Sequence, residues 1–165
     1  MMMSIVEKEI VSLVFYQPEY KALLSNYNLS EEQQRYTALP VDALEKCDSE
    51  PDRHPMIILY GRQPAGFFVL HGWEGVKAYS ENKEAILLRA YSINAEYQGK
   101  GIASQSITLL GPFVKKHFPN VNEIILAVNH ANVVAQNVYK KGGFVDKGIT
   151  AMGREGEMFI YHLDV

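Results

Sequence analysis

A short turn with two glycines, set between a strand-like run and a helix-like run, limits the fold more than any other part of this sequence. The run Ala85–Ile93 is apolar and rich in branched and aromatic side chains, which is typical of a strand. Residues 101–118 then repeat apolar side chains with the period of one helix face. Between the two runs stands the segment Gln98-Gly99-Lys100-Gly101-Ile102-Ala103. The sequence therefore predicts a strand, a tight turn and a long helix in direct succession.

This turn has the features of an anion-binding site. Gly99 and Gly101 let the backbone turn sharply with its N–H groups pointing outward. The helix that follows adds its unpaired N-terminal N–H groups and the positive end of its dipole. A diphosphate would fit there, although an ordinary strand-to-helix turn can have the same residues.

Three phosphate-binding patterns can be compared with the turn. The P-loop string GxxxxGK followed by Ser or Thr is absent from the sequence. The dinucleotide fingerprint needs a third glycine where Ser104 stands, and an acidic residue where Asn129 stands. The third pattern, Q-x-x-G-x-A at a helix start, is matched by Gln98, Gly101 and Ala103.

Further strands and helices surround this unit. Ser30 and Gln33 form a capping-box pattern at a helix start, and Asn129 is a plausible N-cap for a later helix. Pro112 should bend the long helix without ending it. The predicted strands are 10–16, 56–60, 65–70, 85–93, 123–128, 144–149 and 158–163, with helical pieces in 19–52 and helices at 101–118 and 131–141. This order predicts one mixed α/β (α+β) domain over residues 1–165.

Composition supports a single globular domain. The chain has 165 residues, of which 47% are hydrophobic and 21% are charged. Lys plus Arg number 16 and Asp plus Glu number 19, so the net charge of −3 disfavours a nucleic-acid partner. No apolar run approaches the ~20 residues that span a membrane, so we expect no membrane partner.

The cysteine content and the N-terminus favour a cytoplasmic location. Cys47 is the one cysteine, so no internal disulfide can form, which is typical of a reducing compartment. Its neighbours Glu45 and Asp48 disfavour a reactive thiolate. Residues 1–9 show no signal peptide.

Two blocks of the sequence together resemble the Gcn5-related N-acetyltransferase (GNAT) superfamily. The block Gln98–Ala103, after its strand, resembles the family's coenzyme A pyrophosphate loop. The block Asn129–Phe144 resembles the family signature N-x-x-A-x-x-x-Y-x-K-x-G-F, with Asn132, Ala135 and Tyr139 at its first three fixed positions. The blocks stand in the family's order, separated by one helix and one strand, and the resemblance covers residues 87–147.

The resemblance implies an acetyl-CoA-dependent N-acetyltransferase with a mixed central sheet of about six to seven strands, splayed after the fourth strand and flanked by helices. Pantetheine would lie in the splay and pair with backbone groups at the end of the fourth strand, which the resemblance places at Ser92, Ile93 and Asn94. The pyrophosphate would lie on backbone N–H groups, which it places at Gln98, Gly99, Lys100, Gly101, Ile102, Ala103 and Ser104. Acetyl-CoA would be the co-substrate, a small-molecule amine the acceptor, and the protein a monomer or a homodimer.

The chemistry needs a group that stabilises the departing thiolate. The resemblance implies that Tyr139 faces the cofactor sulfur and acts as its acid, and that Asn132 contacts the pantetheine. Ala135, which lies between them on one helix face, is small enough for the pantetheine arm to pass. The alternatives are a core aromatic for Tyr139 and a capping or exposed polar residue for Asn132.

The general base is left open by the sequence. An alkyl ammonium with a pKa near ~10 must lose a proton before it can attack. The family's strand glutamate aligns near Ala85, with Glu84 beside it but on the opposite face of a regular strand. Water chains and backbone carbonyls are the alternatives. Arg89, Tyr91 and His71 either line the acceptor pocket or are ordinary sheet residues.

The acceptor is predicted from charge. Residues 30–52 hold seven acidic residues against Arg35 and Lys46, which would form an acidic rim for a cationic amine such as a polyamine, or simply a solvated helix face. Direct transfer in a ternary complex is expected because no activated nucleophile stands out. A non-catalytic acyl-CoA-binding module and a nicotinamide enzyme are the alternative functions.

The five histidines show no metal-binding spacing, so we expect no metal site. His130 lies near the second motif, where it either contacts the cofactor or belongs to a solvated loop.

Overall fold

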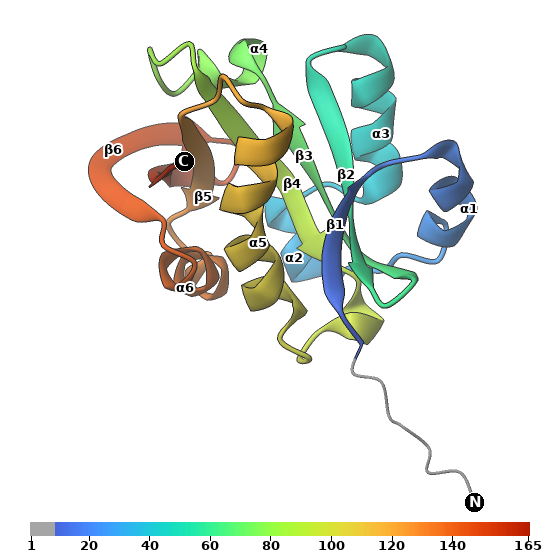
Figure 1. The fold of residues 1–165 in the computed structure, drawn as a ribbon. Helices are drawn as coiled ribbons and strands as arrows, with labels where there is room; N and C mark the ends of the chain where they lie inside the picture. Colours follow the sequence, from blue (N-terminus) through green and yellow to red (C-terminus); the bar gives the residue numbers. More distant parts are fainter. Residues whose placement is uncertain (1–8) are drawn as a thin grey trace, which may run out of the picture.

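The computed structural model describes residues 9–165, so the prediction that residues 1–9 hold no signal peptide concerns a segment that lies almost wholly outside the described residues. A seven-stranded sheet with the order β1-β2-β3-β4-β5-β7-β6 forms its centre (Figure 1). Neighbouring strands are antiparallel except β4 and β5, which run parallel. The strands are β1 Val11–Phe15, β2 Arg53–Tyr60, β3 Gln63–His71, β4 Ala85–Ile93, β5 Glu123–Asn129, β6 Val145–Gly153 and β7 Gly156–Asp164.

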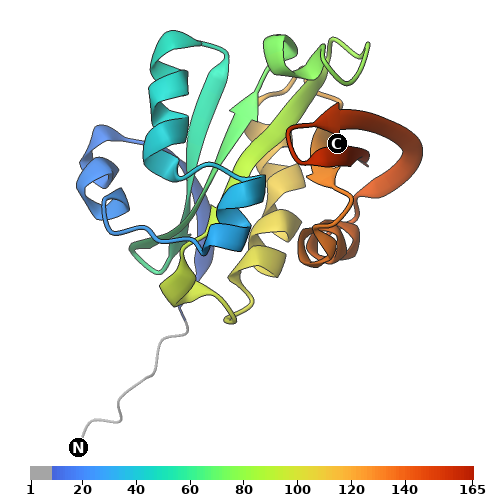
Figure 2. The ribbon, with the colours of Figure 1, turned by 180° about the vertical axis from the view of Figure 1, so that it is seen from behind.

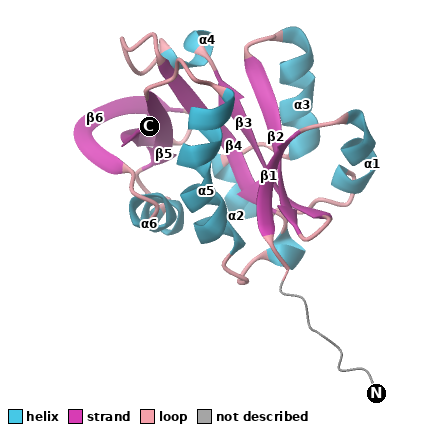
Figure 3. Ribbon diagram, viewed as in Figure 1, coloured by secondary structure: helices cyan, strands magenta, loops and turns pink. Residues whose placement is uncertain are grey.

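Helices cover both faces of the sheet. The helices are η1 Pro18–Tyr20, α1 Lys21–Leu24, α2 Glu31–Tyr36, α3 Pro40–Ser49, α4 Trp73–Val76, η2 Ala95–Tyr97, α5 Ile102–His117 and α6 Val133–Lys141. Figure 1 shows α5 in front of the sheet, whereas the reversed view in Figure 2 shows α2 and α3 in front of it. Figure 3, coloured by secondary structure, shows the sheet between these two helical layers. The sequence prediction of a mixed sheet flanked by helices is confirmed.

Hydrophobic side chains pack on both faces of the sheet. The larger core packs α5 and α6 on the sheet through residues such as Leu88, Ile107 and Tyr139. The second core packs α1 and α3 on the opposite face through Leu24 and Ala43. A side chain's place in the sheet therefore decides which helical layer it meets.

Several local predictions are confirmed. β4 has the predicted bounds, and α5 continues through Pro112 to His117. The capping box is present, with the Ser30 hydroxyl accepting from the N–H of Gln33 at 3.1 Å and the Gln33 side chain accepting from the N–H of Ser30 at 3.0 Å.

The predicted N-cap of α6 is wrong. Asn132 caps this helix, and its side-chain oxygen accepts from the N–H of Ala135. The Asn129 side chain instead accepts from the N–H of Ala131 at 2.8 Å, closing the turn before the helix. Either asparagine can bond a nearby N–H, so the residue type alone did not distinguish them. Because Asn132 is the N-cap, the helix begins at Val133, two residues later than predicted.

The sheet opens between β4 and β5. These strands pair only from Ala85 opposite Glu123 to Leu88 opposite Leu126, whereas β4 stays paired with β3 as far as Ile93. A bulge interrupts the β3–β4 register just past the last β4–β5 pair, where Ala90 has a φ of +53°. Bulges bend a strand and increase its twist, so the splay predicted after the fourth strand follows from this local geometry.

Candidate active site

A cavity of about 800 Å³ opens where β4 and β5 diverge. On one side of the sheet it is lined by the start of α5 and by α6, and on the other side by α2 and the tip of the β6–β7 hairpin. The predicted site residues that line it are Ser92, Ile93, Gln98, Gly99, Gly101, Ile102, Ala103, Ser104, Asn132, Ala135 and Tyr139. The two sequence blocks, far apart in the chain, therefore meet at one cavity.

Two predicted cofactor-binding residues lie outside the cavity lining. The N–H of Asn94 donates to the carbonyl of Ala65 at 2.8 Å, and its side-chain oxygen accepts from the N–H of Asn28 at 3.1 Å. Asn94 is buried, so it holds the end of β4 to its neighbours. Lys100 is exposed on the outside of the glycine loop.

The glycine loop presents free backbone donors to the cavity. Gly99 and Gly101 have φ values of +82° and +79°, which glycine adopts without strain. Within residues 9–165, the N–H groups from Gly99 to Ser104 have no hydrogen-bond acceptor, and α5 begins at Ile102. The row of donors at a helix start fits a diphosphate. The N–H of Gln98 is not part of this row, since it donates to the carbonyl of Ala95 at 3.3 Å.

The Gln98 side chain braces the loop. Its amide nitrogen donates to the carbonyl of Ile93 at 2.8 Å and lies 3.3 Å from the side-chain oxygen of Gln33 on α2. The glutamine thus joins the end of β4 to the opposite layer. Sequence reasoning assigned this residue only a backbone role.

Tyr139 lies on α6 with its ring buried and its side chain in the cavity lining. Within the described part of the chain, its hydroxyl has no hydrogen-bond partner. Burial raises the pKa of Tyr139, and the neighbouring Tyr91 raises it further. The phenol therefore keeps its proton and has a free donor facing the cavity.

Tyr91 lines the same cavity but its hydroxyl is occupied. It lies 2.5 Å from the Ser106 hydroxyl, which donates to the carbonyl of Ala103 at 2.8 Å. The ring of Tyr91 meets that of Tyr139 edge-on, with 6.0 Å between centroids. Tyr91 is thus a fixed support for the ring of Tyr139.

Asn132 and Ala135 combine two of the predicted roles. Asn132 caps α6, as the capping alternative proposed, and also lines the cavity. Ala135 and Tyr139 follow it on the same lining face of α6. Because Ala135 has a short side chain, the cavity keeps its width beside the helix.

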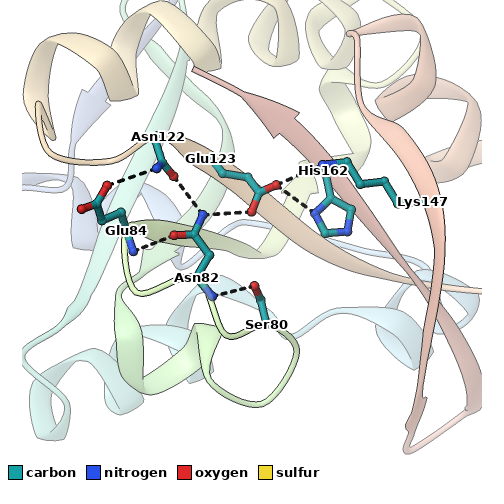
Figure 4. A network of polar contacts seen from close by, with 7 residues as sticks. All are labelled: Ser80, Asn82, Glu84, Asn122, Glu123, Lys147 and His162. Atoms are coloured by element: carbon teal, nitrogen blue, oxygen red, sulfur yellow. Dashed lines mark hydrogen bonds and ion pairs between the residues drawn. The ribbon is translucent and has the colours of Figure 1, made fainter.

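Glu84 is not a candidate base. It accepts a hydrogen bond from the Asn122 side chain at 3.1 Å, at the far end of the β4–β5 pair from the cavity (Figure 4). Ala85 is buried in the paired half of β4. The carboxylates that do line the cavity are Glu32 and Glu155, and both are exposed at its mouth.

The predicted acidic rim is largely absent from the cavity. Of the seven acidic residues between positions 30 and 52, only Glu32 lines it. Asp42, Glu45 and Asp48 lie on α3 and face solvent, because α3 packs along the sheet beside the second core. The solvated helix face was the correct alternative for these residues.

Arginines outnumber carboxylates in the cavity lining. Arg35 on α2 lies 3.5 Å from Glu155 at the hairpin tip, and Arg154 donates to the carbonyl of Arg35 at 3.3 Å. These contacts join α2 to the β6–β7 hairpin. Arg89 also lines the cavity, whereas His71, the other predicted pocket residue on this face, is buried beneath it.

Cys47 and His130 do not take part in the site. Cys47 is half-buried, and burial raises the pKa of its thiol. His130 is exposed and its ring lies against Phe159, with centroids 4.9 Å apart. Within residues 9–165, no cluster of three His, Cys, Asp or Glu is placed to hold a metal ion, and no helix is long and apolar enough to cross a membrane.

Comparison with known proteins agrees with this geometry. Residues 20–144 match the Acetyltransferase (GNAT) family. The uncharacterized N-acetyltransferase YbbJ of Bacillus subtilis (strain 168) is 42% identical over 153 residues, which cover 92% of this chain and 96% of that protein.

Solved structures share the fold at lower identity. The aminoglycoside acetyltransferase AAC(6')-Ib in complex with coenzyme A has a TM-score of 0.73 and 19% identity, covering 94% of this chain and 95% of that one. The spermidine N-acetyltransferase from Vibrio cholerae, in complex with CoA and spermine, has a TM-score of 0.68 and 17% identity, covering 93% of this chain and 95% of that one.

The chain belongs to the GNAT family of acetyltransferases. Its membership confirms the fold, the enzyme class and the acetyl-CoA co-substrate that the two sequence blocks implied.

Proposed function

We propose that this protein transfers the acetyl group of acetyl-CoA to a primary amine, directly and within a ternary complex. The observation that carries the proposal is one cavity that reaches both faces of the sheet through the β4–β5 splay. The free backbone donors of the glycine loop lie on one side of it, and α2 with the hairpin tip lies on the other. A thioester and an amine can therefore approach each other from opposite sides.

The cofactor would be held mainly by backbone groups. The N–H groups from Gly99 to Ser104 would bind the diphosphate, as free amides at a helix start do. Beyond Leu88 the edge of β4 has no β5 partner, so its backbone near Ser92 and Ile93 would pair with the amide groups of pantetheine. Ala135 would leave room for that arm beside α6.

Tyr139 would serve the departing sulfur. A thiol has a pKa near ~8.5, whereas burial raises the pKa of Tyr139 above its ordinary value. The phenol is the weaker acid, so it acts by donating a hydrogen bond that strengthens as negative charge develops on sulfur. Its hydroxyl has no competing partner in residues 9–165.

The amine would lose its proton to water or to a backbone carbonyl. The deep part of the cavity has no carboxylate among the described residues, since Glu32 and Glu155 lie exposed at its mouth. Direct transfer is favoured because Cys47 lies outside the cavity lining, and its thiol pKa is raised.

A polycationic acceptor has weak support from this cavity. Glu155 is already paired with Arg35, which leaves Glu32 as the unpaired carboxylate of the described lining. The spermidine and aminoglycoside enzymes share the fold with this chain at less than 20% identity. Similarity at this level shows a common fold and does not identify the acceptor.

The test is release of coenzyme A thiol from acetyl-CoA in the presence of a panel of amines, amino acids, polyamines, aminoglycosides and peptides. We expect at least one primary amine to give thiol and an equal amount of N-acetylated product by mass spectrometry. Binding of acetyl-CoA without turnover of any amine would favour the non-catalytic binding module. Binding of a nicotinamide cofactor but not of coenzyme A would select the redox alternative.

A further inference from the structure

Arg89 is the first residue of β4 beyond the part of the strand that pairs with β5. It lies opposite Val69 in the β3–β4 register, and Val69 belongs to the core under α1 and α3. Leu88, the residue before it, belongs to the core under α5. Arg89 therefore points to the face of the sheet opposite the glycine loop, and it lines the cavity there.

A neutral histidine holds Arg89 in place. The Nη1 atom of Arg89 lies 3.2 Å from Nδ1 of His71. Because a guanidinium can only donate, Nδ1 accepts and the ring proton is on Nε2, which lies 3.2 Å from Oδ1 of Asp52. His71 is buried, and burial followed by the charge of Arg53 lowers its pKa. The ring is thus uncharged, and it orients the guanidinium without neutralising it.

No carboxylate of the described residues forms an ion pair with Arg89. Glu50 is paired with Arg53 at 3.1 Å, and Asp52 faces His71. Burial lowers the pKa of Arg89, as expected for a cation partly removed from water. A charge partly removed from water is costly unless it is paired, and within residues 9–165 the guanidinium in the cavity lining has no hydrogen-bond partner besides His71.

Among the described residues of the acceptor half, no carboxylate lies within ion-pair distance of Arg89. Arg35 and Glu155 neutralise each other, Arg154 adds a further positive charge, and Glu32 is exposed at the mouth. A polyamine would place a second ammonium near an unpaired arginine, which is repulsive. The same positive charge would lower the pKa of an acceptor ammonium and assist its deprotonation.

We propose that Arg89 binds a carboxylate of the acceptor, so that the substrate is an amine that also carries an acid group, such as an amino acid. This inference rests on the proposed acetyltransferase function and names its acceptor class. Arg89 is the specificity-determining residue and His71 is its positioning residue. A guanidinium suits this role because its planar fork matches a carboxylate with two hydrogen bonds.

The test uses acceptors matched in length that differ in one end group. Butylamine, 4-aminobutyrate and 1,4-diaminobutane present a methyl, a carboxylate and an ammonium group, and the same comparison is made with amino acids and their decarboxylated amines. We expect kcat/KM to be about 10- to 100-fold higher for the carboxylate member of the best series. Equal or better turnover of the neutral or dicationic members in every series would overturn the proposal.

Variants assign the preference to Arg89. In Arg89→Gln the carboxylate preference should disappear mainly through a higher KM for the acid members of each series, while the affinity for coenzyme A stays unchanged. Arg89→Lys should restore part of the preference. Arg62→Gln, at an exposed arginine on the β2–β3 turn, is the matched control. Loss of coenzyme A affinity in Arg89→Gln, with acceptor preference intact, would assign the arginine to the cofactor instead.

A binding measurement separates this inference from the proposed function. The protein loaded with coenzyme A is titrated with N-acetyl-4-aminobutyrate and with N-butylacetamide, which needs no turnover, and the acetylated amino acids and amines are compared likewise. Tighter binding of the acids, lost in Arg89→Gln, supports the acid site even if no amine reacts. Turnover of amines without any such preference would retain the acetyltransferase and reject the site. If no amine is acetylated and the acids bind no more tightly than the neutral compounds, both the acetyltransferase function and the acid site are rejected.

Discussion

The two ends of the β4–β5 pair are built in opposite ways. At the closed end, the strands are paired from Ala85 to Leu88, and polar side chains around them bond one another (Figure 4). At the open end, the pairing stops. Among residues 9–165, the Tyr139 hydroxyl in the cavity lining has no hydrogen-bond partner, and Arg89 has no acidic partner. Polar groups that bond one another hold the strands together, whereas unpartnered donors that line a cavity are available to a ligand.

Glu123 is the centre of the closed end. Its carboxylate accepts from the Asn82 side chain at 3.2 Å and lies 3.1 Å from Nδ1 of His162 and 3.5 Å from Nζ of Lys147. Asn82 also bonds Asn122 at 2.9 Å, so the network connects the loop before β4 with the start of β5 and with β6 and β7. This network fixes where the strands meet, and thereby where they can part.

The largest expected effect is at the open end. Tyr139→Phe should lower kcat about 100-fold, as loss of one hydrogen-bond donor to a developing negative charge does, while the affinity for acetyl-CoA stays nearly unchanged. The measurement is steady-state thiol release together with calorimetric binding of acetyl-CoA.

Tyr161→Phe is the matched control for this change. Tyr161 is fully buried in the same core, has an unpartnered hydroxyl in the described chain, and lies outside the cavity lining. Its variant should keep normal kcat. An unchanged kcat and pH profile in Tyr139→Phe would remove the assigned role.

The next effect is at the closed end and concerns stability. Glu123→Ala should lower the free energy of unfolding by about 2 kcal/mol, because it leaves the buried Nδ1 of His162 without its partner and removes one of the two bonds of the Asn82 side chain. Activity per folded molecule should be unchanged. Urea unfolding followed by circular dichroism measures this, with the exposed Glu45→Ala as control. A variant that unfolds normally but loses activity would contradict the separation of the two ends.

A smaller effect is expected in the glycine loop. Gly101→Ala should cost about 1 kcal/mol because an L side chain is strained at a φ of +79°, and it should weaken acetyl-CoA binding. Gly111→Ala, inside α5 where a Cβ would meet only ordinary contacts, should instead be neutral or slightly stabilising. Equal effects of the two substitutions on acetyl-CoA affinity would show that binding does not depend on the conformation of the glycine loop.

The smallest effect is in the pH dependence of stability. Burial alone would raise the pKa of Glu123, but bonds from Asn82 and His162 and the charges of His162 and Lys147 outweigh it and hold the pKa below its ordinary value. The ionised group therefore stabilises the fold above its unfolded pKa of ~4.3, and this contribution is lost as pH falls through the lower folded pKa. The stability difference between the natural protein and Glu123→Gln should shrink between pH 7 and pH 3. A difference independent of pH would refute the ionised network.

Local sequence patterns predicted the parts of the site that depend on local geometry. β4, the turn with two glycines and α5 were predicted because glycine positions and helical spacing act over a few residues, whereas the role of the α6 face as cavity lining was implied by the family resemblance. The acidic rim was wrong because charge counts do not say which way α3 faces.

Long-range contacts account for what the sequence could not provide. His71 and Arg89 are 18 residues apart, and Glu123 and His162 are 39 apart. Their meeting depends on the strand order β3-β4-β5-β7, which no local pattern contains. The unpaired charge of Arg89 becomes visible only when its neighbours are known.

The most direct test of the contrast between the two ends is hydrogen–deuterium exchange with and without acetyl-CoA. We expect slower exchange for the backbone N–H groups from Gly99 to Ser104 when acetyl-CoA is bound, and unchanged exchange for residues 82–88 and 122–126 at the closed end. Unaltered exchange in the glycine loop with acetyl-CoA bound would show that these N–H groups do not hold the cofactor.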